Sequence, residues 1–135
     1  MTKVRDLMTI SCVTAPPTTP VVEAHQLMLQ KRIRHLLVTE GPTLVGIVTD
    51  RDIRLNLPSP ATSLSVWEIN YLLARMTVGF VMSKSVVTIE SGREASEAAQ
   101  LLLDHKIGAL PVVDRGHLVG IITETDLLRA FVKAG

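Results

Sequence analysis

The chain has 135 residues and a mass of 14.7 kDa, which fits one compact domain of ordinary size and leaves no room for two full domains. Hydrophobic residues make up 47% and charged residues 20%, so the composition is that of a folded globular protein and not of a disordered one. The net charge of +1 and the 3% of aromatic residues disfavour a general binder of nucleic acid, and no apolar run approaches the roughly 20 residues of a membrane-spanning helix.

The first part of the chain predicts a strand, a helix, a hairpin and a second helix. A short strand is expected at residues 12–14, and a helix follows with Thr19-Pro20 at its start and apolar residues at i, i+3, i+4 spacing, namely Ala24, Leu27 and Met28. Two apolar runs at 35–39 and 44–48 predict a hairpin. The next helix is expected to begin near Thr49.

A linker with its own helix follows. Residues 57–60, Leu-Pro-Ser-Pro, break the chain, and Ser65 with Glu68 has the spacing of a capping box that opens a helix. We therefore expect a structured linker between the two halves.

The last part predicts the same order of elements. A strand is expected at 86–88, and a capping box of Ser91 and Glu94 is expected to open a helix. A hairpin at 110–113 and 118–122 and a helix from Thr123 complete the chain.

The two parts are copies related by an offset of 74 residues, which places Met8 on Met82. The register holds without a gap and sets Leu44-Val45-Gly46-Ile47 on Leu118-Val119-Gly120-Ile121. Two copies with no third predict one pseudo-twofold domain, because solenoid arrays usually need three or more repeats. The copies take residues 1–56 and 78–135, and residues 57–77 are the linker.

These copies resemble a CBS-domain pair, also called a Bateman module. The resemblance covers nearly the whole chain and includes the openings Asp6-Leu7-Met8 and Phe80-Val81-Met82, and two copies of Gly-hydrophobic-x-Thr-x-x-Asp that end at Asp52 and Asp126. It implies an α/β (α+β) fold of tandem CBS repeats, each β-α-β-β-α, related by a pseudo-twofold axis. It also implies a regulatory module without catalytic activity, which binds adenosine-containing ligands in clefts between the copies and pairs into flat dimers.

The two Thr-x-x-Asp segments have two interpretations. Thr49 with Asp52, and Thr123 with Asp126, can offer a hydroxyl, free backbone N–H groups at a helix start, and a carboxylate for ribose hydroxyls. The same spacing is also a capping box in its Asp form, which needs no ligand. Physical chemistry alone favours the cap, whereas the resemblance favours ligand contact by at least one of the two aspartates.

The resemblance implies two ligand-binding clefts. One cleft combines Thr19, Ala24, Ile33 and Arg34 of the first copy with Ile121, Thr123 and Asp126 of the second. The other combines Arg93, Ala98, Ile107 and Gly108 with Ile47, Thr49 and Asp52. Ordinary core packing is the alternative for the aliphatic members Ala24, Ala98, Ile47 and Ile121.

A basic run at residues 31–35 distinguishes the copies. Arg34 and His35 fall on Gly108 and Ala109, so the two clefts are expected to differ in charge. One interpretation of Arg34 and His35 is contact with phosphate, which suits the planar guanidinium fork. The alternative is a solvated helix end, where positive charge is favourable beside free carbonyl groups.

Other chemistry has little support in the sequence. The four histidines are scattered and Cys12 is the single cysteine, so neither a metal site nor an internal disulfide is expected. No Walker loop, Rossmann fingerprint or nucleophile elbow occurs. Cys12 in its strand is expected to be a small buried hydrophobe, and Gly46 and Gly120 predict close backbone packing.

The sequence therefore predicts a sensor and not an enzyme. An adenine nucleotide, AMP or ATP first among the candidates, is expected as regulatory ligand rather than cofactor, and it would shift the population of states that an unidentified regulated protein recognises. We also expect a homodimer, no membrane insertion and no nucleic-acid partner. The N-terminus has no apolar signal core, which favours a cytoplasmic location. A ligand-free interaction scaffold of the same fold is the alternative.

Overall fold

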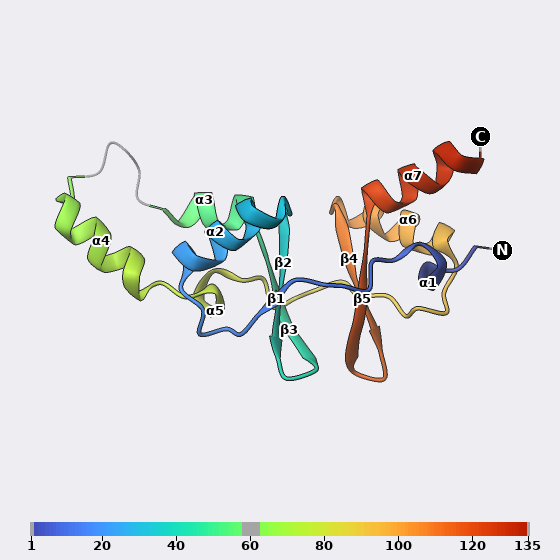
Figure 1. Cartoon of the computed structure of the whole chain (residues 1–135), viewed down its shortest axis with the longest axis horizontal. Helices are drawn as coiled ribbons and strands as arrows, with labels where there is room; N and C mark the ends of the chain where they lie inside the picture. Colours follow the sequence, from blue (N-terminus) through green and yellow to red (C-terminus); the bar gives the residue numbers. More distant parts are fainter. Residues whose placement is uncertain (1, 58–62, 135) are drawn as a thin grey trace. The chain divides into compact units, whose positions relative to one another are not determined.

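The computed structural model describes residues 2–57 and 63–134 (Figure 1). The chain has a mixed α/β fold and divides into two compact units, each assembled from separate stretches of sequence. Unit 1 contains Met1–Cys12, Pro42–Leu44 and Val86–Gly135, and unit 2 contains Val13–Gly41 and Val45–Ser85.

Unit 2 is built on a sheet with the strand order β1-β2-β3. Its elements are β1 (Thr14–Ala15), α2 (Val21–Lys31), β2 (His35–Glu40), most of β3 (Thr43–Thr49), α3 (Asp50–Asn56), α4 (Val66–Arg75) and α5 (Val78–Val81). β1 runs parallel to β2, with Thr14 opposite Leu37. A parallel neighbour requires a crossover, and α2 supplies it.

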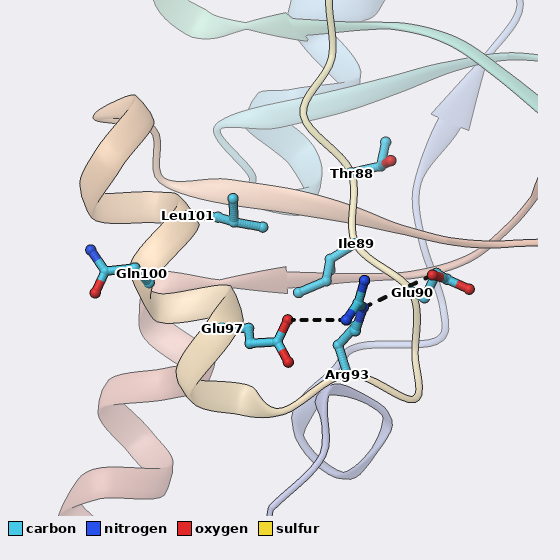
Figure 2. A pocket seen from close by; sticks show the side chains of 7 residues that line it. All are labelled: Thr88, Ile89, Glu90, Arg93, Glu97, Gln100 and Leu101. Carbon is cyan, nitrogen blue, oxygen red and sulfur yellow. Dashed lines mark ion pairs between the residues drawn. The ribbon is translucent and has the colours of Figure 1, made fainter.

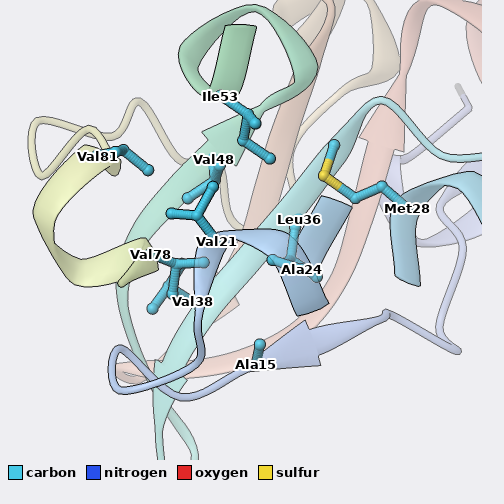
Figure 3. Packing of buried hydrophobic residues seen from close by; sticks show 10 residues of the cluster. All are labelled: Ala15, Val21, Ala24, Met28, Leu36, Val38, Val48, Ile53, Val78 and Val81. Carbon is cyan, nitrogen blue, oxygen red and sulfur yellow. The ribbon is translucent and has the colours of Figure 1, made fainter. Parts of the chain in front are cut away.

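The core of unit 2 gathers apolar side chains from the sheet and from α2, α3 and α5 (Figure 3). α2 buries one face only, through residues spaced three and four apart, as expected of an amphipathic helix. The cluster consists of Ala15, Val21, Ala24, Met28, Leu36, Val38, Val48, Ile53, Val78 and Val81. Burial of these side chains holds the helices against the sheet.

Unit 1 is built on the antiparallel hairpin of β4 (Ala109–Asp114) and β5 (His117–Thr123), with a register shift between Val112 and Val113. Its helices are α1 (Val4–Leu7), α6 (Ala95–His105) and α7 (Glu124–Ala134). The core contains Val4, Ile89, Ala98, Leu102, Leu110, Val112 and Ile122.

The short leading helix of each sequence copy belongs to the unit that holds the rest of the other copy. In unit 1, Val4 of α1 is fully buried and its N–H donates to the Arg93 carbonyl oxygen at 2.8 Å. In unit 2, Val78 of α5 is fully buried and donates to the Thr19 carbonyl oxygen at 2.9 Å. Equivalent residues therefore make equivalent bonds in the two units. The limits of the compact units are set by this packing and differ from the limits of the sequence copies.

Most of the predicted elements are confirmed. Both hairpins form, and helices begin directly after Thr49 and Thr123. The linker helix α4 has its capping box, since Ser65 Oγ accepts from Glu68 N at 3.2 Å and Glu68 Oε1 accepts from Ser65 N at 3.1 Å. Apart from Leu57, the chain break predicted at 57–60 lies outside the described residues.

The first strand of the first copy lies later than predicted, and the predicted first strand of the second copy does not form. β1 covers Thr14–Ala15 instead of residues 12–14, and the second copy has only a parallel bridge of Ile89 with Val112 instead of a strand at 86–88. The N–H of Cys12 donates to the Ile10 carbonyl oxygen at 2.8 Å, and this local turn removes it from strand pairing. Cys12 therefore precedes the strand and is half-buried.

Two predicted helix caps are also wrong. The N-cap of α6 is Glu94, because Ser91 bonds to Asp114 instead and Glu94 Oε1 pairs with Lys3 Nζ at 2.6 Å. The N-cap of α2 is Pro20, in an extended conformation and without a side-chain bond, so Thr19 does not cap this helix. In α6, tertiary partners take the groups that the local pattern assigned to the cap.

Candidate functional site

Thr49 and Asp52 bond to each other's backbone at the start of α3. Thr49 Oγ1 accepts a hydrogen bond from Asp52 N at 3.1 Å, and Asp52 Oδ2 accepts one from Thr49 N at 2.8 Å. Asp52 is half-buried, and no described residue bonds to its Oδ1. The capping interpretation is confirmed, and one carboxylate oxygen remains for another donor.

Thr123 and Asp126 make the same arrangement at the start of α7. Thr123 N donates to Asp126 Oδ2 at 2.9 Å, and Asp126 N donates to Thr123 Oγ1 at 3.2 Å. Asp126 is only 8% exposed, and its Oδ1 lies 3.7 Å from a guanidinium nitrogen of Arg129, an exposed residue one turn along the helix. The second cap is therefore more enclosed than the first, and a nearby cation partly offsets its charge.

In each copy a main-chain hydrogen bond joins the start of the helix that follows the hairpin, α3 or α7, to the segment that enters that hairpin. Asp50 N donates to the Arg34 carbonyl oxygen at 3.2 Å, and Glu124 N donates to the Gly108 carbonyl oxygen at 3.0 Å. Arg34 is exposed, and its guanidinium has no partner among the described residues, whereas His35 is half-buried. The first copy thus has an unpaired cation close to its Thr-Asp cap, where the second copy has a glycine.

Ile33 and Ile107 follow left-handed residues at the ends of α2 and α6. Arg32 and Lys106 have φ values of 56° and 54°, and the N–H of each isoleucine bonds back to a carbonyl of the helix at 3.0 and 3.1 Å. Both isoleucines are half-buried against the core of their unit. They keep apolar surface exposed at the entrance to β2 and β4.

Two further predicted residues of the first copy differ in accessibility. Ala24 is fully buried in the core of unit 2, as its packing interpretation predicts, and Ala98 is fully buried in unit 1. Thr19 is half-buried before α2. Of Thr19 and Ala24, only Thr19 has surface that is exposed to solvent.

Ile47 and Ile121 pair through their backbones with the segments that follow α5 and α1. Ile47 exchanges hydrogen bonds of 3.1 and 2.9 Å with Ser83, and Ile121 exchanges bonds of 3.0 and 2.8 Å with Thr9. Both isoleucine side chains are half-buried. Their positions are fixed by main-chain bonds and do not depend on a ligand.

The glycines before these isoleucines allow the close approach. A Cβ atom at Gly46 would lie 2.5 Å from Met82 Sδ and 3.0 Å from the Ser83 carbonyl oxygen. At Gly120 it would lie 2.9 Å from Met8 Sδ and 2.9 Å from the Thr9 carbonyl oxygen. The predicted close packing at both glycines is confirmed.

Each of the two predicted clefts takes residues from both units. For the first cleft, Thr19, Ala24, Ile33 and Arg34 lie in unit 2, and Ile121, Thr123 and Asp126 lie in unit 1. For the second, Arg93, Ala98, Ile107 and Gly108 lie in unit 1, and Ile47, Thr49 and Asp52 lie in unit 2. The structure describes each half by itself, and the clefts stay a prediction.

An open hollow of about 490 Å³ lies beside the start of α6 in unit 1 (Figure 2). Its lining residues are Thr88, Ile89, Glu90, Arg93, Glu97, Gln100 and Leu101. The guanidinium of Arg93 lies 4.0 Å from Glu90 Oε1 and 3.6 Å from Glu97 Oε2. Of these lining residues, only Arg93 was predicted from the sequence as a ligand contact. The register of the copies held a further signal, because Glu97 and Gln100 are identical to their counterparts Glu23 and Gln26.

The remaining chemistry of the chain is limited. Within residues 2–57 and 63–134, no three side chains of His, Cys, Asp or Glu gather where they could hold a metal ion. In that same part of the chain, no helix has the length and apolar character needed to cross a bilayer. Burial raises the pKa of the Cys12 thiol, so the thiol stays protonated at neutral pH and is a poor nucleophile.

Two copies of one helix–hairpin–helix arrangement, each with a Thr-x-x-Asp cap on its last helix, define a tandem-repeat protein of the mixed α/β class. The family model of the CBS domain matches residues 4–59 and 78–133. The chain belongs to the CBS domain family.

Known proteins resemble the chain over almost its whole length. The CBS domain-containing protein YhcV of Bacillus subtilis is 33% identical over 127 residues, which cover 94% of this chain and 84% of that protein. The crystal structure of CBSX2 in complex with AMP has a TM-score of 0.78 and 32% identity, with 99% of this chain and 98% of that chain covered. The CBS domain pair of protein MJ0100, in complex with 5′-methylthioadenosine and S-adenosyl-L-methionine, has a TM-score of 0.81 and 26% identity, with 100% and 99% covered. The fold class and the family predicted from the sequence are confirmed.

Proposed function

We propose that the chain is a regulatory module that binds an adenine nucleotide of the AMP, ADP or ATP type and signals its presence to a protein partner. The observation that carries this proposal is the pair of caps, Thr49 with Asp52 and Thr123 with Asp126, at equivalent helix starts. Each aspartate uses Oδ2 for its cap and keeps Oδ1 outside it. A carboxylate already fixed by its own backbone bonds is a pre-organised acceptor for ribose hydroxyls.

The other predicted residues supply the remaining parts of a nucleotide site. Arg34 and His35 are the proposed phosphate contacts, since a guanidinium matches the spacing of phosphate oxygens. In the first cleft, the half-buried residues Thr19, Ile33 and Ile121 are proposed to surround the base, with Ala24 packed beneath. In the second cleft, Ile47 and Ile107 are proposed to take that role. Because Gly108 replaces Arg34 in the second copy, we expect the two sites to differ in ligand or affinity.

The ligands of similar proteins support this class of ligand. CBSX2 was solved with AMP, and MJ0100 was solved with two other adenosine derivatives. All three ligands share the adenosine group, whereas their other substituents differ. The adenosine part is therefore the feature that we propose the chain recognises.

The proposed mechanism is a shift of population. A ligand that binds one conformation of the chain more tightly raises the share of that conformation, by no more than its difference in affinity for the two states. A regulated protein would then recognise the favoured state. The proposal contains no chemical step, and we assign no catalytic residue.

We also propose that the chain forms a homodimer through α6 and α7. Leu103, Leu128 and Phe131 of these helices are largely exposed, and an apolar groove of about 450 Å³ lies beside the first two. Exposed apolar surface of this kind marks an interaction site. Light scattering at micromolar concentration is expected to give the mass of two chains, and the mass of one chain would contradict the dimer.

A ligand-free scaffold is the second candidate. The observation in its favour is that both Thr-Asp pairs form complete capping boxes without any ligand. On this account the aspartates contribute to stability alone, by about 1 kcal/mol each.

A thermal-shift titration with AMP, ADP, ATP, NADH and S-adenosylmethionine tests the proposal. A ligand at 100 times its Kd adds about 2.7 kcal/mol to the free energy of unfolding and moves the midpoint by several degrees. A selective shift by one or more of these ligands supports the sensor and identifies the effector. No shift at millimolar concentration contradicts it and favours the scaffold.

A further inference from the structure

A second hollow in unit 1, of about 310 Å³, opens between α1, the loop before α6 and the turn that joins β4 to β5. Each of the three segments places one arginine in its wall: Arg5, Arg93 and Arg115 respectively. Ser91 and the carboxylates of Glu90 and Asp114 also line it. Arg93 and Glu90 also line the larger hollow beside the start of α6. Figure 2 shows both residues as part of that larger hollow.

The three arginines all belong to unit 1, and the repeat places no arginine at the equivalent positions of unit 2. At the offset of 74 residues, their counterparts are neutral: Arg5 falls on Gly79, Arg93 on Thr19 and Arg115 on Gly41. The positions come from three separate parts of the sequence, yet they line one hollow. A difference in charge at all three of them indicates a role for this hollow that unit 2 does not share.

Two of the three guanidinium groups have no carboxylate partner. Arg93 lies near Glu97 and Glu90, whereas no described residue makes an ion pair or side-chain hydrogen bond with Arg5 or Arg115. A guanidinium carries five N–H donors, which an anion can accept. The hollow therefore offers unused positive charge and unused donors.

Asp114, the carboxylate whose charge interacts with these two arginines, is already hydrogen-bonded. Asp114 Oδ1 accepts from Ser91 N at 2.9 Å, and Oδ2 accepts from Ser91 Oγ at 2.5 Å. The N–H and hydroxyl groups of Ser91 satisfy the Asp114 carboxylate. The guanidinium groups of Arg5 and Arg115 can therefore bind a ligand without first breaking a hydrogen bond to Asp114.

The backbone of Arg115 is left-handed. Its φ is +52°, and Gly116 follows with a φ of +79°, so the turn requires two left-handed residues in succession. The counterpart Gly41 has a φ of +61°. An arginine costs stability in this conformation where a glycine does not, and an unfavourable backbone often accompanies a functional side chain.

We infer that this hollow binds a phosphoryl group, through Arg5, Arg93 and Arg115. Guanidinium groups form paired, charge-assisted hydrogen bonds with phosphate oxygens, and three arginines outnumber the two carboxylates in the wall. The phosphoryl group comes from inorganic phosphate or from a nucleotide. The site extends beyond the predicted nucleotide contacts, because Arg93 is assigned to the second predicted cleft whereas Arg5 and Arg115 belong to neither cleft.

The test is an NMR titration of the full chain with inorganic phosphate at constant ionic strength, followed at the amide of Gly92 in the wall of the hollow. The expected result is a saturable shift that Arg115→Gly and Arg5→Gln each weaken by about tenfold or more. Arg115→Gly suits the turn, so loss of the fold does not explain a loss of binding. Lys84→Gln, which removes one exposed positive charge of unit 2, is the control and leaves the affinity unchanged.

Adenosine and AMP distinguish the two sources. If a nucleotide supplies the phosphoryl group, AMP shifts Gly92 and binds more tightly than adenosine, and Arg115→Gly removes that advantage. If inorganic phosphate is the ligand, it saturates the hollow and AMP does not displace it. The absence of a saturable shift with either probe, or equal weakening by Lys84→Gln, overturns the inference. Failure of the nucleotide proposal is distinguishable, because phosphate still binds while no adenosine ligand stabilises the chain.

Discussion

Ser91 holds both carboxylate oxygens of Asp114, with its N–H 2.9 Å from Oδ1 and its hydroxyl 2.5 Å from Oδ2. The pair ties the loop before α6 to the end of β4. The Ser91 side-chain bond and then its backbone bond lower the pKa of Asp114, with smaller contributions from the charges of Arg115 and Arg5, against an opposing effect of burial. The ionised form of Asp114 therefore stabilises the folded state.

Removal of the Asp114 charge is expected to reduce the sensitivity of the fold to acid. A carboxyl group with a lowered pKa in the folded state stabilises above its unfolded pKa of about 4, and this stabilisation is lost as the pH falls through the folded value. Between about pH 6 and pH 3, the melting midpoint of Asp114→Asn should therefore fall less than that of the wild type. Thermal melts followed by circular dichroism measure the difference, and parallel decline in both proteins would contradict the prediction.

Ser91→Ala, which removes the side-chain bond to Asp114 only, should lower the free energy of unfolding by about 1 kcal/mol at neutral pH.

The two strand glycines are expected to resist substitution. Gly46→Ala and Gly120→Ala place a Cβ within 3.0 Å of a main-chain oxygen, which cannot move as a side chain can. Each should lower the free energy of unfolding by about 1–3 kcal/mol in denaturant titrations. Gly92→Ala is the matched control, because the nearest atom to its Cβ would be 3.8 Å away, at the flexible end of the Arg5 side chain. Equal stability of all three variants would show that the close approach at β3 and β5 has no energetic consequence.

Glycine is expected to stabilise the ends of α2 and α6. Arg32 and Lys106 occupy left-handed conformations, in which a side chain is unfavourable. Arg32→Gly and Lys106→Gly should each raise the free energy of unfolding by roughly 0.5–1 kcal/mol. Lys31→Gly, one residue earlier and inside the helix, should lower it by about 1 kcal/mol. A loss of stability at position 32 or 106 would refute the backbone argument.

The leading helices are expected to contribute to the cores of their units. Val4→Ala and Val78→Ala each remove buried methyl groups from an equivalent, fully enclosed position, and each should cost about 2 kcal/mol. Val22→Ala on the exposed side of α2 is the control and should change stability by less than about 0.5 kcal/mol. Chemical denaturation measures all three, and equal effects would show that α1 and α5 are not part of the cores.

Local signals in the sequence predicted the elements that depend on local bonds. The Ser65–Glu68, Thr49–Asp52 and Thr123–Asp126 spacings all form capping boxes, because their partners lie within one turn of helix. The hairpins followed from apolar runs separated by short turns. The Gly-hydrophobic-x-Thr-x-x-Asp pattern occurs twice, at equivalent positions of the two copies, and this repetition indicated the family. A single copy of the pattern would have been weak support.

Tertiary competition explains what local signals missed. The Ser91–Glu94 spacing is also that of a capping box, but Asp114 is 23 residues away from Ser91 and Lys3 is 91 residues away from Glu94, so no local pattern reveals these partners. The placement of α1 with the second copy is likewise a property of packing. The same holds for the arginine hollow, whose three arginines are far apart in the sequence and were visible only as differences between the copies.

The central claim is that Asp52 and Asp126 serve a nucleotide as well as a helix. The most direct test is a calorimetric titration of Asp52→Ala and Asp126→Ala with the adenosine ligand that gives the largest thermal shift. Glu68→Ala is the control, because it removes the equivalent capping hydrogen bond from α4. All three variants should lose about 1 kcal/mol of stability. At least one of the two aspartate variants should weaken binding tenfold or more, about 1.4 kcal/mol, while Glu68→Ala should bind as the wild type does. An unchanged Kd in both aspartate variants would contradict it and leave the two aspartates as helix caps alone.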